Sequence, residues 1–177
     1  MIEDKVETDV RNWVESFVVG LNLCPFAKKE LLADRVRLAV SSVDSELELL
    51  AVLQFELELL ERDDNIETTL LIHPCVLTEF EDYNQFLALC DGLLGQLGLE
   101  GVYQIASFHP GYRFEGTEMD AVENNTNRSP YPLLHLLRED SLESAIANFP
   151  DVDQIPLRNI ELMRKLGRES QEKGKLK

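Results

Sequence analysis

Three short runs of apolar and β-branched residues recur along the chain, and long helix-forming stretches separate them. The runs occupy residues 36–40, 68–73 and 102–108. Each has the length of an ordinary strand. The connections of about two dozen residues are long enough for crossover helices, and this order of strands and helices is typical of right-handed βαβ units on a parallel sheet. The sequence therefore predicts an α/β fold with a small, mainly parallel sheet of three strands or slightly more, covered by helices.

The remaining stretches carry the signals of helices. Apolar residues recur at spacings of three and four between Val6 and Leu21, which predicts an amphipathic helix that ends near Gly20. Residues 45–62 alternate Glu and Leu in part, but they are strong helix formers and too many for a usual strand, so we expect a helix there. Three further helices are expected, one ending at Gly98 and two that form a C-terminal helical segment over residues 140–149 and 156–172.

A long polar segment follows the third run. Residues 109–129 contain few apolar side chains, and a loop of this length in a compact domain is usually either functional or disordered. Tyrosine and proline residues stand at both of its ends, so we favour a functional loop. Ser129 as N-cap and Pro130 at the first helical position then predict a helix through Arg138.

Length and charge restrict the class of protein. A chain of 177 residues can bury a core, so we expect residues 1–177 to form a single domain, with the oligomeric state left open. The formal net charge of −16 argues against a nucleic-acid partner, because phosphate binding needs a basic surface. No signal peptide and no apolar run of ~20 residues is present, which argues against a membrane partner. The three cysteines lack any disulfide-framework or zinc spacing, so we expect a cytoplasmic protein.

Two His-Pro pairs follow two of the predicted strands. His73 ends the second run and His109 follows the third, and each precedes a proline. On a parallel sheet both would lie at the edge where the strands end, which is where open α/β sheets bind ligands. We therefore expect the two histidines to be neighbours, although an antiparallel arrangement would weaken this inference.

The polar loop carries a candidate anion-binding site. Asn127 and Arg128 would lie at the N-terminus of the helix predicted after Ser129, where free backbone N–H groups favour phosphate or carboxylate. Arg128 can bind such a group through two hydrogen bonds. The pocket for a small anionic molecule would be completed by Tyr112, Arg113, Tyr131 and His135. The structural alternative is that Arg128 pairs with a carboxylate of the loop and fixes the shape of the loop.

Three residues are candidates for catalysis. His109 is the expected general acid or base, with His73 assisting, because histidine titrates near neutral pH. Cys24 lies near Lys28 and Lys29, and nearby cations lower the pKa of a thiol, so a nucleophilic pair of Cys24 with His109 is an alternative. Buried free cysteines are usually inert, and this interpretation of Cys24 stays open beside the nucleophilic one.

A metal site is a further alternative. Zinc with an open position for water could be held by three histidines and one loop carboxylate: His73, His109 and His135 with Glu115, Glu118 or Asp120. No two of these histidines have a metal-binding spacing, however, and His135 in its apolar run suits the core equally well. The cofactor is therefore left unknown, with zinc as the metal considered.

Four stretches spread over the chain carry a resemblance to a family. They are residues 20–27 (GLNLCPFA), 68–74 (TTLLIHP), 106–110 (ASFHP) and 126–139 (TNRSPYPLLHLLRE). In these stretches the chain resembles a bacterial family known as domain of unknown function 1415, with Cys75 standing where an acidic residue is usual. The resemblance implies one cytoplasmic bacterial domain, and it brings no activity, cofactor or catalytic residue.

These observations lead to three alternative functions. The first is a small-molecule enzyme that acts on an anionic metabolite, with histidine acid–base chemistry and an anion-binding loop at Asn127 and Arg128. The second is a non-catalytic binding or partner-interaction module, and the third is a metal-dependent hydrolase with histidine ligands. A cavity with His109 and Arg128 directed into it favours the enzyme. Engagement of both side chains in internal hydrogen bonds favours the binding module.

Overall fold

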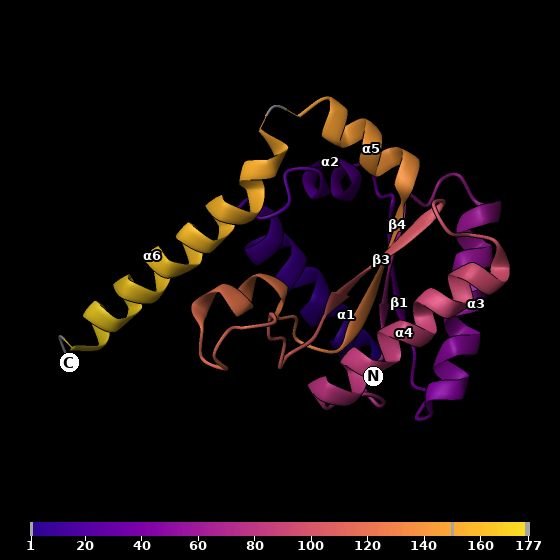
Figure 1. Cartoon of the computed structure of the whole chain (residues 1–177), viewed down its shortest axis with the longest axis horizontal. Coiled ribbons are helices and arrows are strands. Elements are labelled where there is room, and N and C mark those ends of the chain that lie inside the picture. Colours follow the sequence, from indigo (N-terminus) through magenta and orange to yellow (C-terminus); the bar gives the residue numbers. More distant parts are fainter. Residues whose placement is uncertain (1, 150, 176–177) are drawn as a thin grey trace.

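A central four-stranded sheet organises the fold. The computed structural model describes residues 2–149 and 151–175. The strands lie in the order β1 (Val36–Val40), β2 (Thr68–Ile72), β4 (Leu133–Arg138) and β3 (Tyr103–Phe108) (Figure 1). β1 and β2 are parallel, whereas β4 runs antiparallel to both of its neighbours. The α/β class is confirmed, but the prediction of a mainly parallel sheet is wrong, because β4 makes the sheet mixed. The expected three strands or slightly more become four.

The fourth strand comes from residues predicted to be helical. Because β4 lies between β2 and β3, it packs against helical layers on both faces of the sheet, and such a strand has a nearly continuous apolar sequence. Periodicity cannot distinguish a short run of this kind from a helix. Ser129 and Pro130 do not begin a helix either. An N-cap side chain accepts a hydrogen bond from a backbone N–H, whereas the Ser129 hydroxyl donates one to the carbonyl oxygen of Tyr131 at 2.6 Å.

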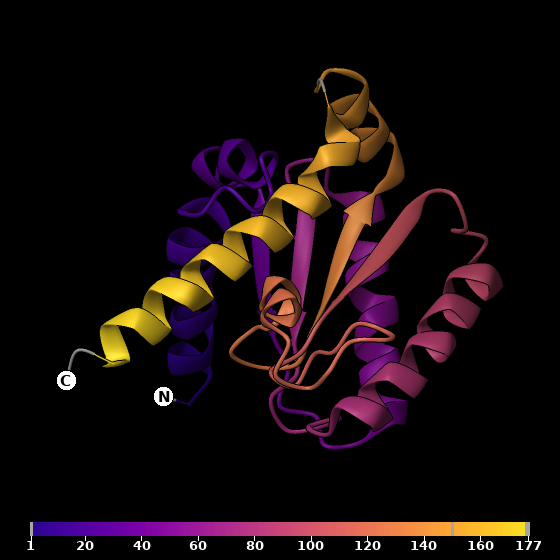
Figure 2. The same cartoon turned by 60° about the vertical axis from the view of Figure 1, so that its left-hand side comes forward.

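Helices cover both faces of the sheet (Figure 2). α1 continues into a π-helix, η1, and two short 3₁₀ helices, η2 and η3, lie in the C-terminal half. The bounds are α1 (Ile2–Trp13), η1 (Val14–Val19), α2 (Ala27–Leu32), α3 (Glu46–Arg62), α4 (Phe80–Leu97), η2 (Val122–Asn127), α5 (Glu139–Ala147), η3 (Val152–Gln154) and α6 (Ile155–Lys175). The helices predicted before Gly20, over residues 45–62, before Gly98 and in the C-terminal segment are confirmed.

The alternation of side chains along the strands divides the core into two layers. One face of the sheet packs against α3 and α4, and its buried residues include Leu71, Leu134 and Leu136. The other face packs against α1, and its buried residues include Leu70 and Leu133. Burial is worth roughly 1.5–3 kcal/mol for each such leucine, so both layers hold the strands in register.

The end of the N-terminal helical stretch depends on a glycine. The Gly20 N–H donates to the carbonyl oxygen of Glu15 at 3.0 Å, which is a π-helical hydrogen bond. A Cβ atom at Gly20 would lie 2.1 Å from the carbonyl oxygen of Ser16, so only glycine fits this turn. The chain then turns through Asn22, whose φ is 53°, and passes Cys24 before α2 and the start of β1.

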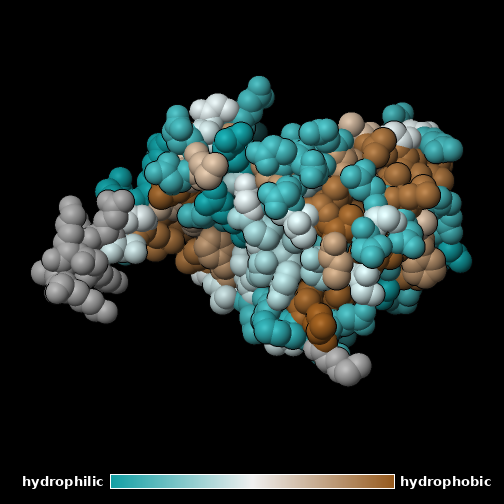
Figure 3. Space-filling view, turned by 90° about the horizontal axis from the view of Figure 1, so that it is seen from below, coloured by the Kyte–Doolittle hydropathy of each residue, from teal (hydrophilic) through white to brown (hydrophobic). Residues whose placement is uncertain are grey.

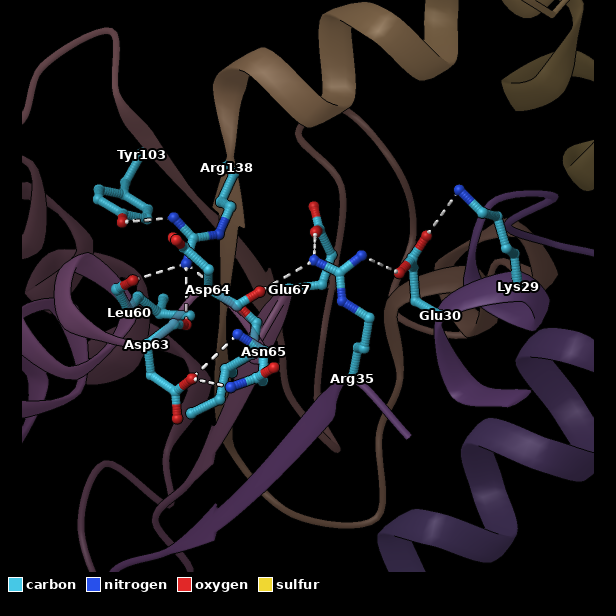
Figure 4. A network of polar contacts seen from close by, with 11 residues as sticks. Lys29, Glu30, Arg35, Leu60, Asp63, Asp64, Asn65, Glu67, Tyr103 and Arg138 are labelled. Atoms are coloured by element: carbon cyan, nitrogen blue, oxygen red, sulfur yellow. Dashed lines mark hydrogen bonds and ion pairs between the residues drawn. The ribbon is translucent and has the colours of Figure 1, made fainter. Parts of the chain in front are cut away.

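Two arginines close the edge of the sheet at which β1 and β2 begin (Figure 4). Arg138, at the end of β4, donates hydrogen bonds to the carbonyl oxygens of Leu60 and Ile66 at 2.6 and 3.0 Å. Arg35, just before β1, forms an ion pair with Glu67 at 2.7 Å. These contacts fix the turn between α3 and β2 to the sheet. The opposite edge, where β1, β2 and β3 end, is named the carboxyl edge below, and it holds the candidate site.

Candidate functional site

His73 and His109 lie at the carboxyl edge, on either side of the start of β4. β2 and β3 are both antiparallel to β4, so they run in the same direction and end at the same edge. The His73 N–H donates to the carbonyl oxygen of Pro132 at 3.0 Å, and the His109 N–H donates to that of Asn127 at 3.2 Å. The mixed sheet therefore places both His-Pro pairs at one edge, although β4 separates the two strands that precede them.

Tyr83 of α4 lies between the two histidines. Its ring stacks on the His73 ring with centroids 5.9 Å apart and meets the His109 ring at 5.0 Å. Its hydroxyl accepts a hydrogen bond from the Phe108 N–H at 3.1 Å and donates one to the carbonyl oxygen of Leu133 at 2.8 Å. The hydroxyl thus joins β3 to β4 where their ladder ends. Our sequence analysis missed this residue, for which the available signal was a tyrosine on a buried helical face, where its hydroxyl needs a partner.

Replacing Tyr83 with phenylalanine is expected to lower the free energy of unfolding by about 2 kcal/mol. The variant keeps the ring but removes the group that pairs the Phe108 N–H with the Leu133 carbonyl. Urea unfolding followed by circular dichroism measures the change. Tyr131→Phe is the matched control, because the Tyr131 hydroxyl donates to Asp9 on the outside of the fold. Equal losses in the two variants would contradict the bridging role of Tyr83.

The ring of His109 is held by two hydrogen bonds that define its tautomer. The Gly111 N–H donates to Nδ1 at 2.9 Å, so Nδ1 carries no proton. Nε2 therefore carries the proton and donates to the carbonyl oxygen of Leu77 at 3.1 Å. The residue is 2% exposed, and burial lowers the pKa of its imidazole, an effect that the nearby carboxylates of Glu79 and Glu81 oppose. At neutral pH the ring is uncharged and both nitrogens are engaged.

His73 and His135 are also neutral, and they lie on opposite faces of the sheet. His73 Nδ1 donates to the carbonyl oxygen of Val76 at 3.0 Å, and burial lowers the pKa of His73 to about 4. Its Nε2 is buried with no hydrogen-bond partner among the described residues. His135 Nε2 donates to the Thr68 hydroxyl at 2.9 Å, and burial lowers the pKa of His135 to about 4.

The three histidines do not converge on one point. His73 and His109 contact Tyr83 on the α4 side of the sheet, whereas His135 lies beside Phe108 on the α1 side. Successive side chains of a strand point to opposite faces, and β4 directs His135 away from the other two. Within residues 2–149 and 151–175, no group of three or more His, Cys, Asp or Glu side chains is arranged to hold a metal ion. Among the described residues, the three histidines therefore give the predicted zinc site no converging set of ligands.

A buried asparagine shapes the polar loop. Asn124, in η2, is fully buried, and its side-chain oxygen accepts hydrogen bonds from the Phe114 N–H at 3.0 Å and the Thr117 hydroxyl at 2.9 Å. Its amide group donates to the carbonyl oxygen of Glu118 at 2.9 Å. One side chain thus satisfies three groups of a segment that has no regular structure of its own. Our sequence analysis did not single out this residue.

The two residues predicted to bind an anion are used inside the protein. Arg128 donates hydrogen bonds to the carbonyl oxygens of Tyr112 at 3.1 Å and Met119 at 2.7 Å. Asn127 donates to the carbonyl oxygen of Ser107 at 3.1 Å. No helix begins at Ser129 or Pro130, and the chain continues into β4 instead, so the helix N-terminus on which their anion-binding role depended is absent there. Arg128 fixes the shape of the loop, although it does so through backbone carbonyls rather than through the loop carboxylate that the structural alternative expected.

A cleft of about 780 Å³ lies between the loop and the first turn of α4. Figure 3 looks onto the carboxyl edge, where hydrophilic surface predominates and a few apolar patches interrupt it. Residues 78–81 form one wall of the cleft, and residues 109–111 form another together with parts of the loop. Arg113 and Arg128 also line it. Arg113 is exposed, and nothing in the described part of the chain pairs with its guanidinium group.

The other candidate residues lie outside the cleft lining. The Tyr112 ring packs between those of Phe80 and Phe114, with centroids 5.2 and 5.0 Å away. The Tyr131 hydroxyl donates to Asp9 of α1 at 2.9 Å. Both tyrosines therefore stabilise the fold around the loop rather than forming the wall of the cleft.

Cys24 lies at the edge opposite His109. It lies between η1 and α2, and Glu30 of α2 forms an ion pair with Arg35 at that edge at 3.3 Å (Figure 4). The neighbouring Leu23 carbonyl accepts a hydrogen bond from Asn159 of α6 at 2.8 Å. The strands of the sheet lie between the two residues, so the structure gives no support to the expected Cys24–His109 pair.

The fold and the cleft define the class of protein: an α/β domain with a mixed four-stranded sheet and a cleft of small-molecule size at the carboxyl edge. None of the helices within the described residues is long and apolar enough to cross a membrane. Residues 5–173 match the family described as "Protein of unknown function (DUF1415)", so the chain belongs to this family, as the four resembling stretches predicted. No curated protein and no solved structure matches the chain.

Proposed function

We propose that the domain binds a small charged molecule in the carboxyl-edge cleft and that Arg113 binds its anionic group. The observation that carries the proposal is the guanidinium of Arg113, which lines the cleft without a partner in the described part of the chain. Arg128, by contrast, is engaged by the loop. The cleft volume of about 780 Å³ falls within the roughly 300–1,000 Å³ of small-molecule sites.

The first turn of α4 supports an anionic group beside Arg113. Residues 78–81 line the cleft, and the side chain of the N-cap residue, Glu79, makes no capping hydrogen bond to this 18-residue helix. The first N–H groups of a helix have no partner within it, and together with the helix dipole they attract negative charge. A carboxylate or phosphate of the ligand would therefore be stabilised from two directions.

Carboxylates restrict the ligand further. Four acidic residues also line the cleft: Glu79, Glu81, Glu118 and Asp120. They would repel a molecule that carries several negative charges. A ligand with one anionic and one cationic group, such as a small amino-acid-like zwitterion, matches both kinds of lining residue better than the purely anionic metabolite expected from the sequence.

Engagement of His109 favours binding over catalysis as the main function. Both of its ring nitrogens are hydrogen-bonded inside the protein, and a general base needs a free nitrogen within reach of the substrate. Acid–base catalysis at His109 is the second candidate function, and it is favoured by the position of the residue in the cleft wall. Turnover of the bound ligand would distinguish the enzyme from the binding module.

Removing the charge of Arg113 is expected to weaken ligand binding about tenfold or more, because a charge-assisted hydrogen bond is lost. Small zwitterions and monoanions, beginning with the amino acids, are screened by thermal shift on the wild-type protein. The dissociation constant of each ligand found is then measured by calorimetry for wild type, Arg113→Gln and Arg168→Gln. Arg168, exposed on α6, supplies a control with the same change in charge.

Two results would overturn the proposal. One is the absence of any ligand that stabilises the wild-type protein in the complete series. The other is a ligand that binds Arg113→Gln and Arg168→Gln with the same affinity, since such a ligand does not use the cleft guanidinium.

A further inference from the structure

The contact between His109 and Gly111 can exist in only one protonation state of the imidazole. Nδ1 accepts the Gly111 N–H at 2.9 Å, while Nε2 donates to the Leu77 carbonyl at 3.1 Å. An imidazolium carries a proton on both nitrogens and has no acceptor. Protonation of His109 therefore keeps the hydrogen bond from Nε2 to the Leu77 carbonyl. It also places a new N–H group, at Nδ1, directly opposite the Gly111 N–H, so two donors face each other.

Displacement of Gly111 would move the wall of the cleft. Gly111 lines the cleft, and the next residue, Tyr112, donates its N–H to the His109 carbonyl oxygen at 3.0 Å. The Tyr112 carbonyl is in turn held by Arg128 at 3.1 Å. The hydrogen bond at His109 Nδ1 is thus the first in a short series that fixes the loop against the β2–α4 connection.

Charged and titratable groups face His109 from each element around it. α4 contributes the carboxylate of Glu81 and the neutral phenol of Tyr83, and its N-cap residue contributes the carboxylate of Glu79. Both carboxylates favour the imidazolium. The end of β2 contributes His73, which is itself neutral. Burial acts against the charged ring and is the largest influence on the pKa of His109, which is lowered.

The loop itself brings charges of both signs to the cleft. Glu118 and Asp120 favour a cation there, and Arg113 and Arg128 oppose one. Burial remains the largest influence on the pKa of His109, and the hydrogen bond to the Leu77 carbonyl opposes it.

We infer that His109 is a proton-dependent switch for the cleft: the neutral ring holds Gly111 and the loop closed, and the protonated ring releases them. The sign follows from the linkage between folding and protonation. The closed form binds the proton less well than the open form, so closure is favoured near neutral pH and opening is favoured as the pH falls below the usual range of histidine. The inference concerns regulation of the same cleft and rests on the proposed function, but its test requires no ligand.

Acidification is expected to expose the Gly111 amide without unfolding the sheet. Amide hydrogen exchange is measured by NMR on the ligand-free protein from about pH 7.5 to about pH 5, with correction for the intrinsic exchange rate. The protection of Gly111 should fall about tenfold in the wild type through local opening. Amides in the middle of α4 exchange only through global unfolding, so they should stay far better protected than Gly111 at both pH values. In His109→Asn the side-chain oxygen can accept the Gly111 N–H but cannot titrate, so protection should stay constant.

A second measurement uses the wild-type protein alone and does not depend on the folding of a variant. The ring carbon shifts of His109 and the amide shift of Gly111 should titrate with a common midpoint. Different midpoints, protection of Gly111 that does not change with pH, or the same loss of protection in His109→Asn would overturn the inference. None of these results depends on whether Arg113 binds a ligand, so failure of the switch and failure of the proposed function are distinguishable.

Discussion

Arg37→Met is expected to lower the free energy of unfolding by about 3 kcal/mol. Arg37 of β1 forms two hydrogen bonds with Glu56 of α3, from Nε at 2.8 Å and from Nη2 at 3.0 Å. The Glu56 side chain is only 4% exposed, whereas that of Arg37 is 37% exposed. Removing one partner of a buried pair typically costs ~3–5 kcal/mol, because the other charge is left without compensation. Partial exposure of Arg37 to water places the loss at the lower end of that range.

The pair lies between the sheet and the helix that covers it, so its loss affects the docking of α3. The hydrogen bonds to Glu56 raise the pKa of Arg37, in keeping with stabilisation of its charge. Urea unfolding at neutral pH measures the change. Arg62→Met is the matched control, since Arg62 pairs with an exposed carboxylate on the same helix, and such pairs contribute about 0.5 kcal/mol or less.

A double variant separates the pair from the packing of either side chain. Arg37→Met combined with Glu56→Met removes both charges and should recover most of the lost stability, because replacing a buried ion pair with apolar groups is often neutral or stabilising. If Arg37→Met cost no more than Arg62→Met, or if the double variant were less stable than Arg37→Met, the buried pair would not be the cause.

Local sequence specified three strands and most of the helices, and β4 shows why it failed for the fourth strand. β1, β2 and β3 are short apolar runs between long helical stretches, so their lengths and spacings define them. The Leu-rich run of β4 follows a serine and a proline that resemble a helix start. What makes it a strand is pairing with residues far along the chain, since Leu133 lies opposite both Ile72 and Phe108. No local pattern contains that information.

The position of the candidate site could be predicted from the sequence, but the contacts of its individual residues could not. His73 and His109 were placed at one edge because each follows a strand, and strand ends are visible in the sequence. Arg113 and Arg128 are arginines of the same loop, and only the folded loop engages one and leaves the other without a partner. Glu56 was likewise one glutamate among many on α3, and its burial depends on Arg37 of β1.

Acidification from about pH 7 to about pH 5 is expected to destabilise the fold by about 2 kcal/mol through His73. Burial lowers the pKa of His73 to about 4, whereas an unfolded chain has a histidine pKa near ~6.5. Between these values the unfolded state binds a proton that the folded state does not. The stabilisation is therefore fully present above about pH 6.5, falls as the pH falls, and reaches its full loss of about 3 kcal/mol only near pH 4.

The loss has a local cause that a variant can test. A proton on Nε2 of His73 would be buried without an acceptor, because this atom has no hydrogen-bond partner among the described residues and Nδ1 already donates to Val76. His73→Asn keeps a donor for the Val76 carbonyl and removes the titration. Urea unfolding at about pH 7 and about pH 5 gives the pH dependence of each protein. Carboxylates titrate near pH 4, so this window isolates histidine.

The difference between the two proteins, rather than the slope of either one, tests the role of His73. Burial also lowers the pKa of His135 to about 4 and lowers that of His109, so the variant should retain a smaller dependence of the same sign. His135→Asn tests the contribution of His135 on the opposite face of the sheet. The prediction for His73 fails if His73→Asn loses as much unfolding free energy between about pH 7 and about pH 5 as the wild type does. The proton taken up on unfolding would then belong to another group, and the buried, neutral state of His73 would contribute nothing to the acid sensitivity of the fold.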